Sequence, residues 1–257
     1  MTLTNRTPHW IELDGAVNAR AVVPGVLLRS DNLQGLSNAD VRTLVDEHGV
    51  ELVLDLRTGV EVRMEGPGPM TAEPAVRIEH RSLYPEKGNT DLDIDTVIPW
   101  GTEHDESLVD EVPTVRAYMG YVGRRPDSVA ESVRAIAHTK GAVLVHCAAG
   151  KDRTGVVVAI ALDAAGWDRQ VVVEDYMASN DRIEQIFQRL RSSETYRAEL
   201  EGHVAAQHAP VPGAIERVLE LVEAEYGSSV AFLLENGLDE SDIAALRERL
   251  GTSATNQ

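Results

Sequence analysis

What this sequence lacks already restricts its function. A single cysteine, Cys147, excludes a disulfide bond within the chain and fits a reducing compartment. Basic residues are scarce: 24 Lys and Arg stand against 42 Asp and Glu. The resulting net charge of −18 argues against a nucleic-acid partner and against general attraction to anionic membranes.

Two further absences concern location. The N-terminal residues carry no basic segment followed by an apolar one, so no cleavable secretion signal is predicted. No apolar run is long enough to cross a bilayer, so we expect no integral membrane association. The sequence therefore predicts a soluble cytoplasmic protein, and export by a route without a cleavable signal stays open.

The length and composition favour one folded unit. The chain has 257 residues, 43% of them apolar, and no internal repeat, which suits one large domain or one domain with a lid. We expect a single domain over residues 1–257 with a disordered tail at 252–257. Residues 86–112 are rich in Asp and Glu, and we interpret them either as a solvated loop or as a cover over the active site.

The only cysteine lies between two apolar segments. Residues 142–145 form a short β-branched run typical of a strand buried on both faces. Residues 156–162 are apolar and rich in Ala, and Gly166 follows them, which favours a buried helix. Residues 147–153 are therefore predicted to form a loop between strand and helix.

Such a loop suits an oxyanion. Backbone N–H groups curl around a phosphate there, and the following helix directs the positive end of its dipole to the same place. This field favours the thiolate form of Cys147, and the planar guanidinium of Arg153 binds two phosphate oxygens. Thr154 is placed to donate its hydroxyl to the sulfur, and His146 is expected to hold the loop rather than act as a base. The simpler alternative for Cys147 is a small buried apolar residue.

The motif His146-Cys147-x5-Arg153-Thr154 resembles the phosphate loop of the cysteine-dependent protein tyrosine phosphatases. The form Ala-Gly-Lys-Asp-Arg-Thr-Gly at 149–155 is most similar to the atypical bacterial tyrosine and dual-specificity phosphatases of the mycobacterial phosphatase B type. Four further segments resemble that family in the same order: VLLRSDNLQGLS (26–37), VLDLRTGVEVR (53–63), VEDYMASND (173–181) and YGSSVAFLLENGL (226–238).

This resemblance implies an α/β fold of the protein-tyrosine-phosphatase type, with a central, mostly parallel sheet, helices on both faces and additional helical cover. It implies a hydrolase that acts on phosphotyrosine in proteins, or on another phosphomonoester, through a phosphocysteine and without metal or cofactor. Cys147 would be the nucleophile, and Arg153 with the loop residues Ala148, Ala149, Gly150, Lys151 and Asp152 would bind the phosphate. The alternatives are a dual-specificity or phosphoinositide phosphatase, and a phosphate-binding scaffold without turnover.

Two departures from the family pattern fall at the expected pocket wall. The family has a Phe directly after the cysteine, where this chain has Ala148. The family's Asn-Phe-Arg-Asp near the N-terminus is Asn-Ala-Arg-Ala at 18–21 here. Both changes predict a differently shaped pocket, and so leave the substrate preference open.

The general acid is the least determined part of the site. Many tyrosine phosphatases use the Asp of a Trp-Pro-Asp tripeptide, which this chain lacks. Asp152 lies within the loop, and Asp55 follows an apolar strand whose carboxyl end should share a face with Cys147. The alternatives are a salt bridge of Asp152 that stiffens the loop and an ion pair of Asp55 with Arg57 or Arg29.

Other residues carry weaker signals. Lys151 could hold a second phosphate or neutralise Asp152. The spacing of His203 and His208 does not favour a shared helical face, so no metal site is expected there. The remaining expectations are Tyr118 and Tyr121 at the edge of the core, and Asp175 with Asn180 behind the loop.

The expected secondary structure completes the prediction. We expect a hairpin around the Pro-Gly turn at 24–25, strands at 50–54 and 76–83, and a helix capped by Ser37 and Asp40. Further helices are predicted at 111–124, 127–139, 168–179, 180–191, 213–226 and 240–250.

Overall fold

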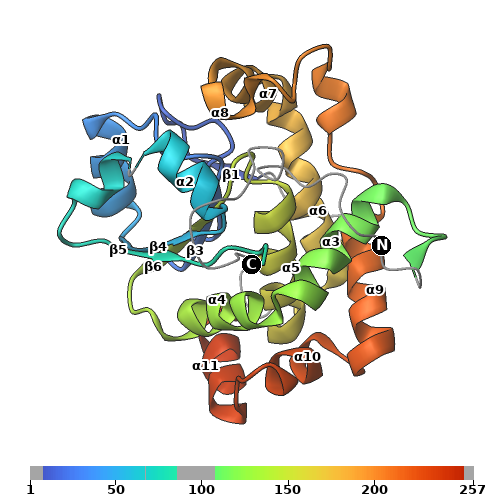
Figure 1. The fold of residues 1–257 in the computed structure, drawn as a ribbon. Helices are drawn as coiled ribbons and strands as arrows, with labels where there is room; N and C mark the ends of the chain where they lie inside the picture. Colours follow the sequence, from blue (N-terminus) through green and yellow to red (C-terminus); the bar gives the residue numbers. More distant parts are fainter. Residues whose placement is uncertain (1–7, 67, 86–107, 252–257) are drawn as a thin grey trace, which may run out of the picture.

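A computed structural model describes residues 8–66, 68–85 and 108–251 of the chain (Figure 1). The tail at 252–257 and most of the acidic segment, residues 86–107, lie outside the described residues, and so does Trp100. The predictions made for these segments therefore stay predictions.

A mixed sheet of six strands in the order β1-β2-β3-β6-β4-β5 forms the framework of the fold. The first three strands pair antiparallel, whereas β3, β6, β4 and β5 run parallel to one another. The predicted, mostly parallel sheet is thus confirmed. The strands are β1 His9–Trp10, β2 Arg20–Val23, β3 Leu27–Ser30, β4 Val50–Asp55, β5 Arg77–His80 and β6 Ala142–His146.

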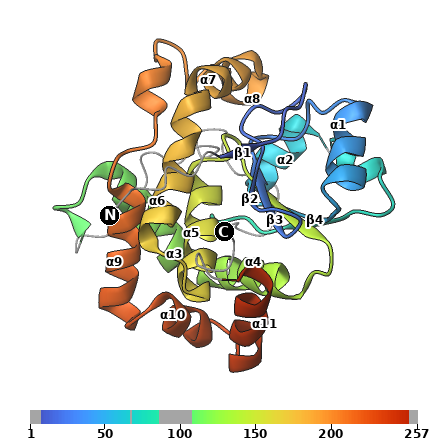
Figure 2. The same ribbon diagram turned by 180° about the vertical axis from the view of Figure 1, so that it is seen from behind.

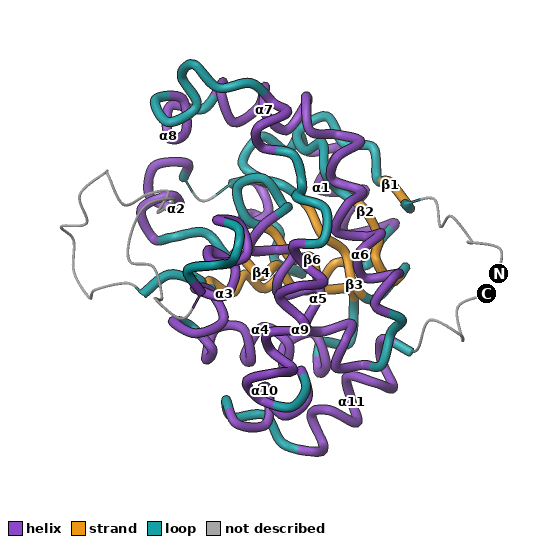
Figure 3. Tube along the Cα trace, turned by 90° about the vertical axis from the view of Figure 1, so that its right-hand side faces the viewer, coloured by secondary structure: helices purple, strands orange, loops and turns teal. Residues whose placement is uncertain are grey.

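Helices cover both faces of this sheet, which lies in the middle of the molecule in Figure 3. In chain order the helices are α1 Asn38–Arg42, the π-helix η1 Thr43–Glu47, α2 Gly59–Glu65, the 3₁₀ helix η2 Pro69–Ala72, α3 Pro113–Arg124, α4 Pro126–His138, α5 Asp152–Ala165, α6 Arg169–Met177, the 3₁₀ helix η5 Ala178–Arg182, α7 Ile183–Ser192, α8 Glu194–Arg197, the 3₁₀ helix η6 Ala205–His208, α9 Ala214–Tyr226, α10 Ser229–Glu235 and α11 Glu240–Leu250.

Alternating side chains of the strands supply two separate cores. Val143 and Val145 of β6 face a large cluster built with α3, α4, α5, α9, α10 and α11. Leu144, between them, faces a smaller cluster with Leu44 of η1. Alternation of this kind follows from the two-residue period of a strand, so both faces of β6 are buried as its apolar sequence predicts.

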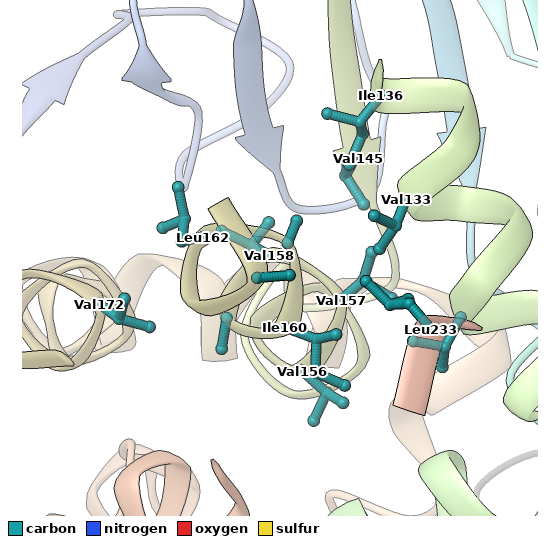
Figure 4. Close-up of a cluster of buried hydrophobic side chains, with 14 of the residues drawn as sticks. Val133, Ile136, Val145, Val156, Val157, Val158, Ile160, Leu162, Val172 and Leu233 are labelled. Carbon is teal, nitrogen blue, oxygen red and sulfur yellow. The ribbon is translucent and has the colours of Figure 1, made fainter. Parts of the chain in front are cut away.

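Helix α5 lies at the centre of the larger core. Figure 4 shows Val156, Val157, Val158 and Ile160 of this helix surrounded by side chains of other elements. Nearly all its residues are buried, which explains why its sequence is apolar on every side rather than on one stripe. The helix ends at Gly166, whose φ of 91° suits glycine.

The main differences from the predicted elements are local. The loop after β6 ends earlier than predicted, because α5 begins at Asp152, whose negative charge suits the first turn of a helix. The predicted strand at 76–83 is limited to β5. Helices α2 and α10 were not predicted, although side-chain caps from Thr58 and Ser228 precede them.

Candidate active site

The backbone of residues 147–151 links β6 to α5 at the carboxyl end of the sheet. Gly150 has a φ of 65°, and a Cβ there would lie 2.3 Å from the carbonyl oxygen of Ser30, so the position requires glycine. No N–H group of residues 148–151 has a hydrogen-bond acceptor among the described residues. These amides are therefore available to an anion, as the loop prediction requires.

The carbonyl groups of residues 148–151, in contrast, accept hydrogen bonds from Asn18, Arg29 and Asn32 in the N-terminal part of the chain. The Asn32 N–H donates to the Ala148 carbonyl at 3.0 Å, and Asn18 Nδ2 donates to the Ala149 carbonyl at 2.9 Å. Arg29 Nη2 donates to the carbonyls of Gly150 at 2.7 Å and Lys151 at 3.3 Å. Holding the carbonyls on one side turns the N–H groups to the other, because the peptide unit is planar.

We call these contacts the brace of the loop. A cluster of charged residues behind the loop holds the brace in place. Asp175 of α6 binds Arg20 Nε at 3.0 Å and Arg29 Nη1 at 2.5 Å. Burial opposes ionisation of Asp175, but the two guanidiniums outweigh it and lower the pKa of the carboxyl. Asp175 thus lies behind the loop, as predicted. Asn180 does not, because it is exposed, and Ser179 accepts hydrogen bonds from Asn18 and Arg20 in its place.

Arg153, in the first turn of α5, is held by a carboxylate that the sequence analysis did not identify. Its Nη1 and Nη2 atoms lie 2.6 and 2.9 Å from the two carboxylate oxygens of Glu61. Glu61 is fully buried. Burial opposes its ionisation, yet Arg153 lowers the pKa of Glu61 and Glu61 in turn raises that of Arg153. Both groups are therefore charged at neutral pH.

Glu61 has its own supports. Its carboxylate accepts from the N–H of Thr58 at 2.7 Å, completing the capping box of α2, and from the hydroxyl of Tyr196 at 2.9 Å. The pattern Thr58-x-x-Glu61 after a buried strand was the signal that could have revealed α2 and this residue. It does not reveal the partner, because Arg153 lies 92 positions further along the chain.

The remaining edge of the Arg153 guanidinium is open. Its Nη1 atom also donates to the Leu56 carbonyl at 3.4 Å, so the described residues occupy both hydrogens on Nη1 and one on Nη2. The N–H of Nε and the second N–H of Nη2 have no described acceptor. Both lie along the same edge of the planar guanidinium. Two parallel donors of this kind match two oxygens of a phosphate.

Asp55 forms the ion pair that the sequence left open as an alternative role. Its oxygens lie 2.9 Å from Arg57 Nε and 2.6 Å from Nη2, and both residues are buried. Burial opposes ionisation of Asp55, but His146 and Arg57 together outweigh it, and the pKa of Asp55 lies well below its ordinary value. Asp55 is also absent from the lining of the cavity that contains Cys147.

His146 contacts Asp55 and the loop at residues 147–151. Its Nε2 lies 3.6 Å from Asp55 Oδ1, and its Nδ1 lies 3.3 Å from the Cys147 carbonyl. Burial lowers the pKa of His146 to about 4, so the ring is neutral at pH 7. These contacts agree with the predicted role in holding the loop.

Asp152 faces the cavity and is fixed by neighbours on two sides. The hydroxyl of Tyr118 on α3 donates to its Oδ1 at 2.5 Å, and Lys151 Nζ lies 3.3 Å from the same oxygen. Tyr118 also exchanges a hydrogen bond with the Tyr176 hydroxyl at 2.9 Å. Lys151 donates to the His208 carbonyl at 2.5 Å, so its ammonium is used within the protein.

These residues surround a cavity of about 710 Å³, including its opening, which we call the catalytic cavity. Cys147, Asp152 and Arg153 line it. Thr154 does not line it, but its hydroxyl is buried without a hydrogen-bond partner among the described residues, next to the loop. The other walls are Tyr84, Tyr121, Ala148, Ala149, Lys151, Ile183, Ile186, Phe187, Leu190, Tyr196, Leu200 and His208.

One minor expectation is corrected by the contacts around this cavity. Tyr121 contacts the cavity, and Tyr118 binds Asp152, so neither is only a core residue. His203 and His208 do not share one regular helix, since His203 precedes the short helix η6 and His208 is its last residue, yet their Nδ1 and Nε2 atoms lie 3.0 Å apart. The described residues contain no group of three or more His, Cys, Asp or Glu side chains suited to a metal ion.

The described helices are also too short or too polar to cross a membrane. Of the acidic segment, Glu111 is described, and its carboxylate binds Arg217 of α9 at 2.7 Å. Glu103 and Asp105 lie outside the described residues.

Comparisons with known proteins agree with this geometry. Residues 12–252 match the model of the tyrosine phosphatase family. The chain is 29% identical to the triple specificity protein phosphatase PtpB of Mycobacterium tuberculosis, over 93% of this chain and 95% of PtpB. It is 28% identical to a tyrosine-protein phosphatase of Nostoc commune, over 92% and 78% of the two chains.

Among solved structures, TpbA of P. aeruginosa, one form of which is in complex with pTyr, matches at 18% identity over 83% of this chain and 98% of TpbA. The TM-score is 0.38, and a second TpbA structure gives 0.39. The family match extends over nearly the whole described chain. The chain therefore belongs to the tyrosine phosphatase family.

Proposed function

We propose that this phosphatase hydrolyses phosphotyrosine in proteins at the catalytic cavity, with Cys147 as the nucleophile. The observation that carries the proposal is that Cys147 and Arg153 line one cavity, beside a loop whose N–H groups have no described acceptor. A phosphate bound there accepts hydrogen bonds on its equatorial oxygens, and their negative charge spreads in the transition state. The positive end of α5 stabilises the same charge.

The first step exchanges one bond to phosphorus for another. The Cys147 thiolate attacks phosphorus, the bond to the tyrosine oxygen breaks, and Asp152 transfers a proton to that leaving oxygen. A water then attacks the phosphocysteine, Asp152 accepts its proton, and phosphate leaves with the thiolate restored. The buried Thr154 hydroxyl supports this last step by donating to the sulfur.

Asp152 is the better candidate for the acid, and Asp55 a positioning residue. Asp152 lines the cavity, whereas Asp55 is engaged in its ion pair with Arg57. Tyr118 and Lys151 both bind Oδ1 of Asp152, which leaves Oδ2 to carry the transferred proton. A general acid contributes roughly 10²–10⁴-fold to rate.

The test of the nucleophile uses the fact that Cys147 is the only cysteine. Acid quenching during turnover of a labelled aryl phosphate should leave one phosphate on the peptide containing Cys147, detected by mass spectrometry. Cys147→Ser should lose turnover but still bind phosphate mimics, because a hydroxyl forms no nucleophile without a base. Retention of more than about 1% of wild-type kcat by Cys147→Ser would contradict the covalent mechanism.

The test of the acid uses the leaving group. Asp152→Asn should lose little activity on aryl phosphates with acidic phenols and far more on phenyl phosphate or phosphotyrosine. Arg153→Lys serves as the comparison, because loss of a bidentate phosphate contact should reduce the rate on every substrate alike. Equal losses on all substrates for Asp152→Asn would remove it from the role of acid.

A further inference from the structure

A second cavity adjoins the catalytic cavity and takes no part in the proposed chemistry. It has about 1110 Å³ including its open mouth, and we call it the side cavity. Ala148, Leu190 and Tyr196 line both cavities, so the two meet beside the catalytic loop. Its other walls are formed mainly by the residues that follow β3, by the end of α2, and by α7 with the start of α8. Helices α2, α7 and α8 lie together in Figure 1.

One charge in the side cavity is not compensated by a cation. The charged side chains in its lining are Asp31, Glu65 and Arg189. Arg189 Nε lies 3.0 Å from Asp31 Oδ2, so these two neutralise each other. Glu65 instead accepts hydrogen bonds from neutral groups, Asn32 Nδ2 at 3.0 Å and the Ser193 hydroxyl. Among the described residues of the lining, Glu65 therefore leaves a net negative charge.

The neutral part of the lining suits a polypeptide backbone. Gln185 and Gln188 on α7 are exposed, and their side-chain amides make no hydrogen bonds within the described ranges of the chain. Gln34 Oε1 is buried and has no described partner. An amide side chain both donates and accepts, as a peptide group does, so such residues complement an extended chain.

We propose that the side cavity binds the polypeptide beside the phosphotyrosine and selects a Lys or Arg side chain there through Glu65. The inference rests on the proposed function, because it assumes that the catalytic cavity holds the phosphotyrosine. Each residue of an extended peptide adds about 3.3 Å of length. The residues directly next to the phosphotyrosine therefore lie beside the wall that the two cavities share. A polyphosphorylated lipid headgroup is disfavoured, since Arg189 is already paired and Glu65 repels it.

The first measurement compares three phosphotyrosine peptides that differ only in having Lys, Gln or Glu at the positions flanking the phosphotyrosine. An attraction between opposite charges at about 4 Å in water corresponds to roughly fivefold in binding. We therefore expect kcat/KM to fall about fivefold from Lys to Gln and again from Gln to Glu. A small aryl phosphate without flanking residues reports the chemical step alone.

Because the whole chain is strongly acidic, basic peptides gain some rate by general attraction, and the variants must separate this effect. Glu65→Gln should remove most of the preference for Lys and leave the small substrate unchanged. Glu248→Gln is the matched control: it changes net charge equally but lies exposed on α11, at the opposite end of the molecule in Figure 1. It should keep the wild-type preference.

Gln188→Lys guards against loss of folding in Glu65→Gln, since it adds a positive charge at an exposed position and breaks no described hydrogen bond. It should shift the preference toward the Glu peptide. The inference is overturned if the preference is the same in wild type, Glu65→Gln and Gln188→Lys, or if inositol phosphates are hydrolysed faster than every peptide. If the wild type does not hydrolyse the small aryl phosphate, the proposed function itself is contradicted.

Discussion

The buried pair of Arg153 and Glu61 allows the sharpest test of how the site is held. Glu61→Ala leaves Arg153, a residue that is 8% exposed, without its carboxylate partner. Removing one partner of a buried ion pair costs about 3–5 kcal/mol, because an unpaired charge remains away from water. The same substitution removes the cap of α2, which overlaps with this loss, so we expect about 4 kcal/mol in total.

That loss is large beside the total stability of roughly 5–15 kcal/mol for a folded domain. For a chain of this length it corresponds to a fall in Tm of roughly 8–16 °C. Urea unfolding followed by circular dichroism should show a lower midpoint with an unchanged slope. Glu220→Gln, which breaks the exposed pair with Arg217, should cost at most about 1 kcal/mol and serves as the control.

A double variant separates charge from shape. Replacing Arg153 and Glu61 together by Met and Leu removes both charges, and such replacements are often neutral or stabilising. The double variant should therefore recover most of the stability lost in Glu61→Ala, yet have no activity. The reasoning about this pair is wrong if Glu61→Ala loses no more unfolding free energy than Glu220→Gln. It is also wrong if the double variant is no more stable than Glu61→Ala.

Three further predictions concern the groups around the loop. Tyr118→Phe removes the donor to Asp152, so rates should fall about tenfold for poor leaving groups and less than threefold for good ones, whereas Tyr121→Phe should not change this dependence. Asp55→Asn should lower unfolding stability and reduce kcat/KM equally across the same leaving-group series, and a steeper dependence would show that it is the acid. Because the folded pKa of His146 is about 4, below the unfolded value of about 6.5, the unfolded chain binds this proton first as pH falls. The unfolding free energy should therefore drop by about 3 kcal/mol between pH 6.5 and 4. Measured against pH over this range, the unfolding free energy of His146→Gln should change less steeply than that of the wild type.

The sequence predicted the parts of the site that are contiguous. The loop between β6 and α5, the proposed nucleophile Cys147 and Arg153 lie within a few residues of one another, and the buried strand and helix fix their arrangement. The apolar runs at 50–54 and 142–145 predicted two buried strands, and the resemblance to the phosphatases implied the mostly parallel sheet that contains them. These inferences depend on local periodicity and on the shared direction of parallel strands.

The unpredicted parts are contacts between distant segments. Periodicity indicates that Tyr118 is buried on a helix, but not that its hydroxyl meets Asp152, which lies 34 positions away. Glu61 was missed because a capping glutamate on the surface and one that pairs with a buried arginine have the same local pattern. For Asp55, the sequence allowed both a free carboxylate and an ion pair, and the side-chain conformation of Arg57 decides between them.

The brace behind the catalytic loop has a consequence for the order in which this protein becomes active. Arg20 and Arg29 are synthesised early, yet their carboxylate partner Asp175 follows 155 and 146 positions later. Until α6 has left the ribosome, closing the loop against the N-terminal hairpin would bury two guanidiniums without a counter-charge. Contacts of such long range also form late, because a long segment of chain must be ordered first. Phosphatase activity should therefore be absent from nascent chains that end before α6, even though they already contain Arg153 and the proposed nucleophile Cys147.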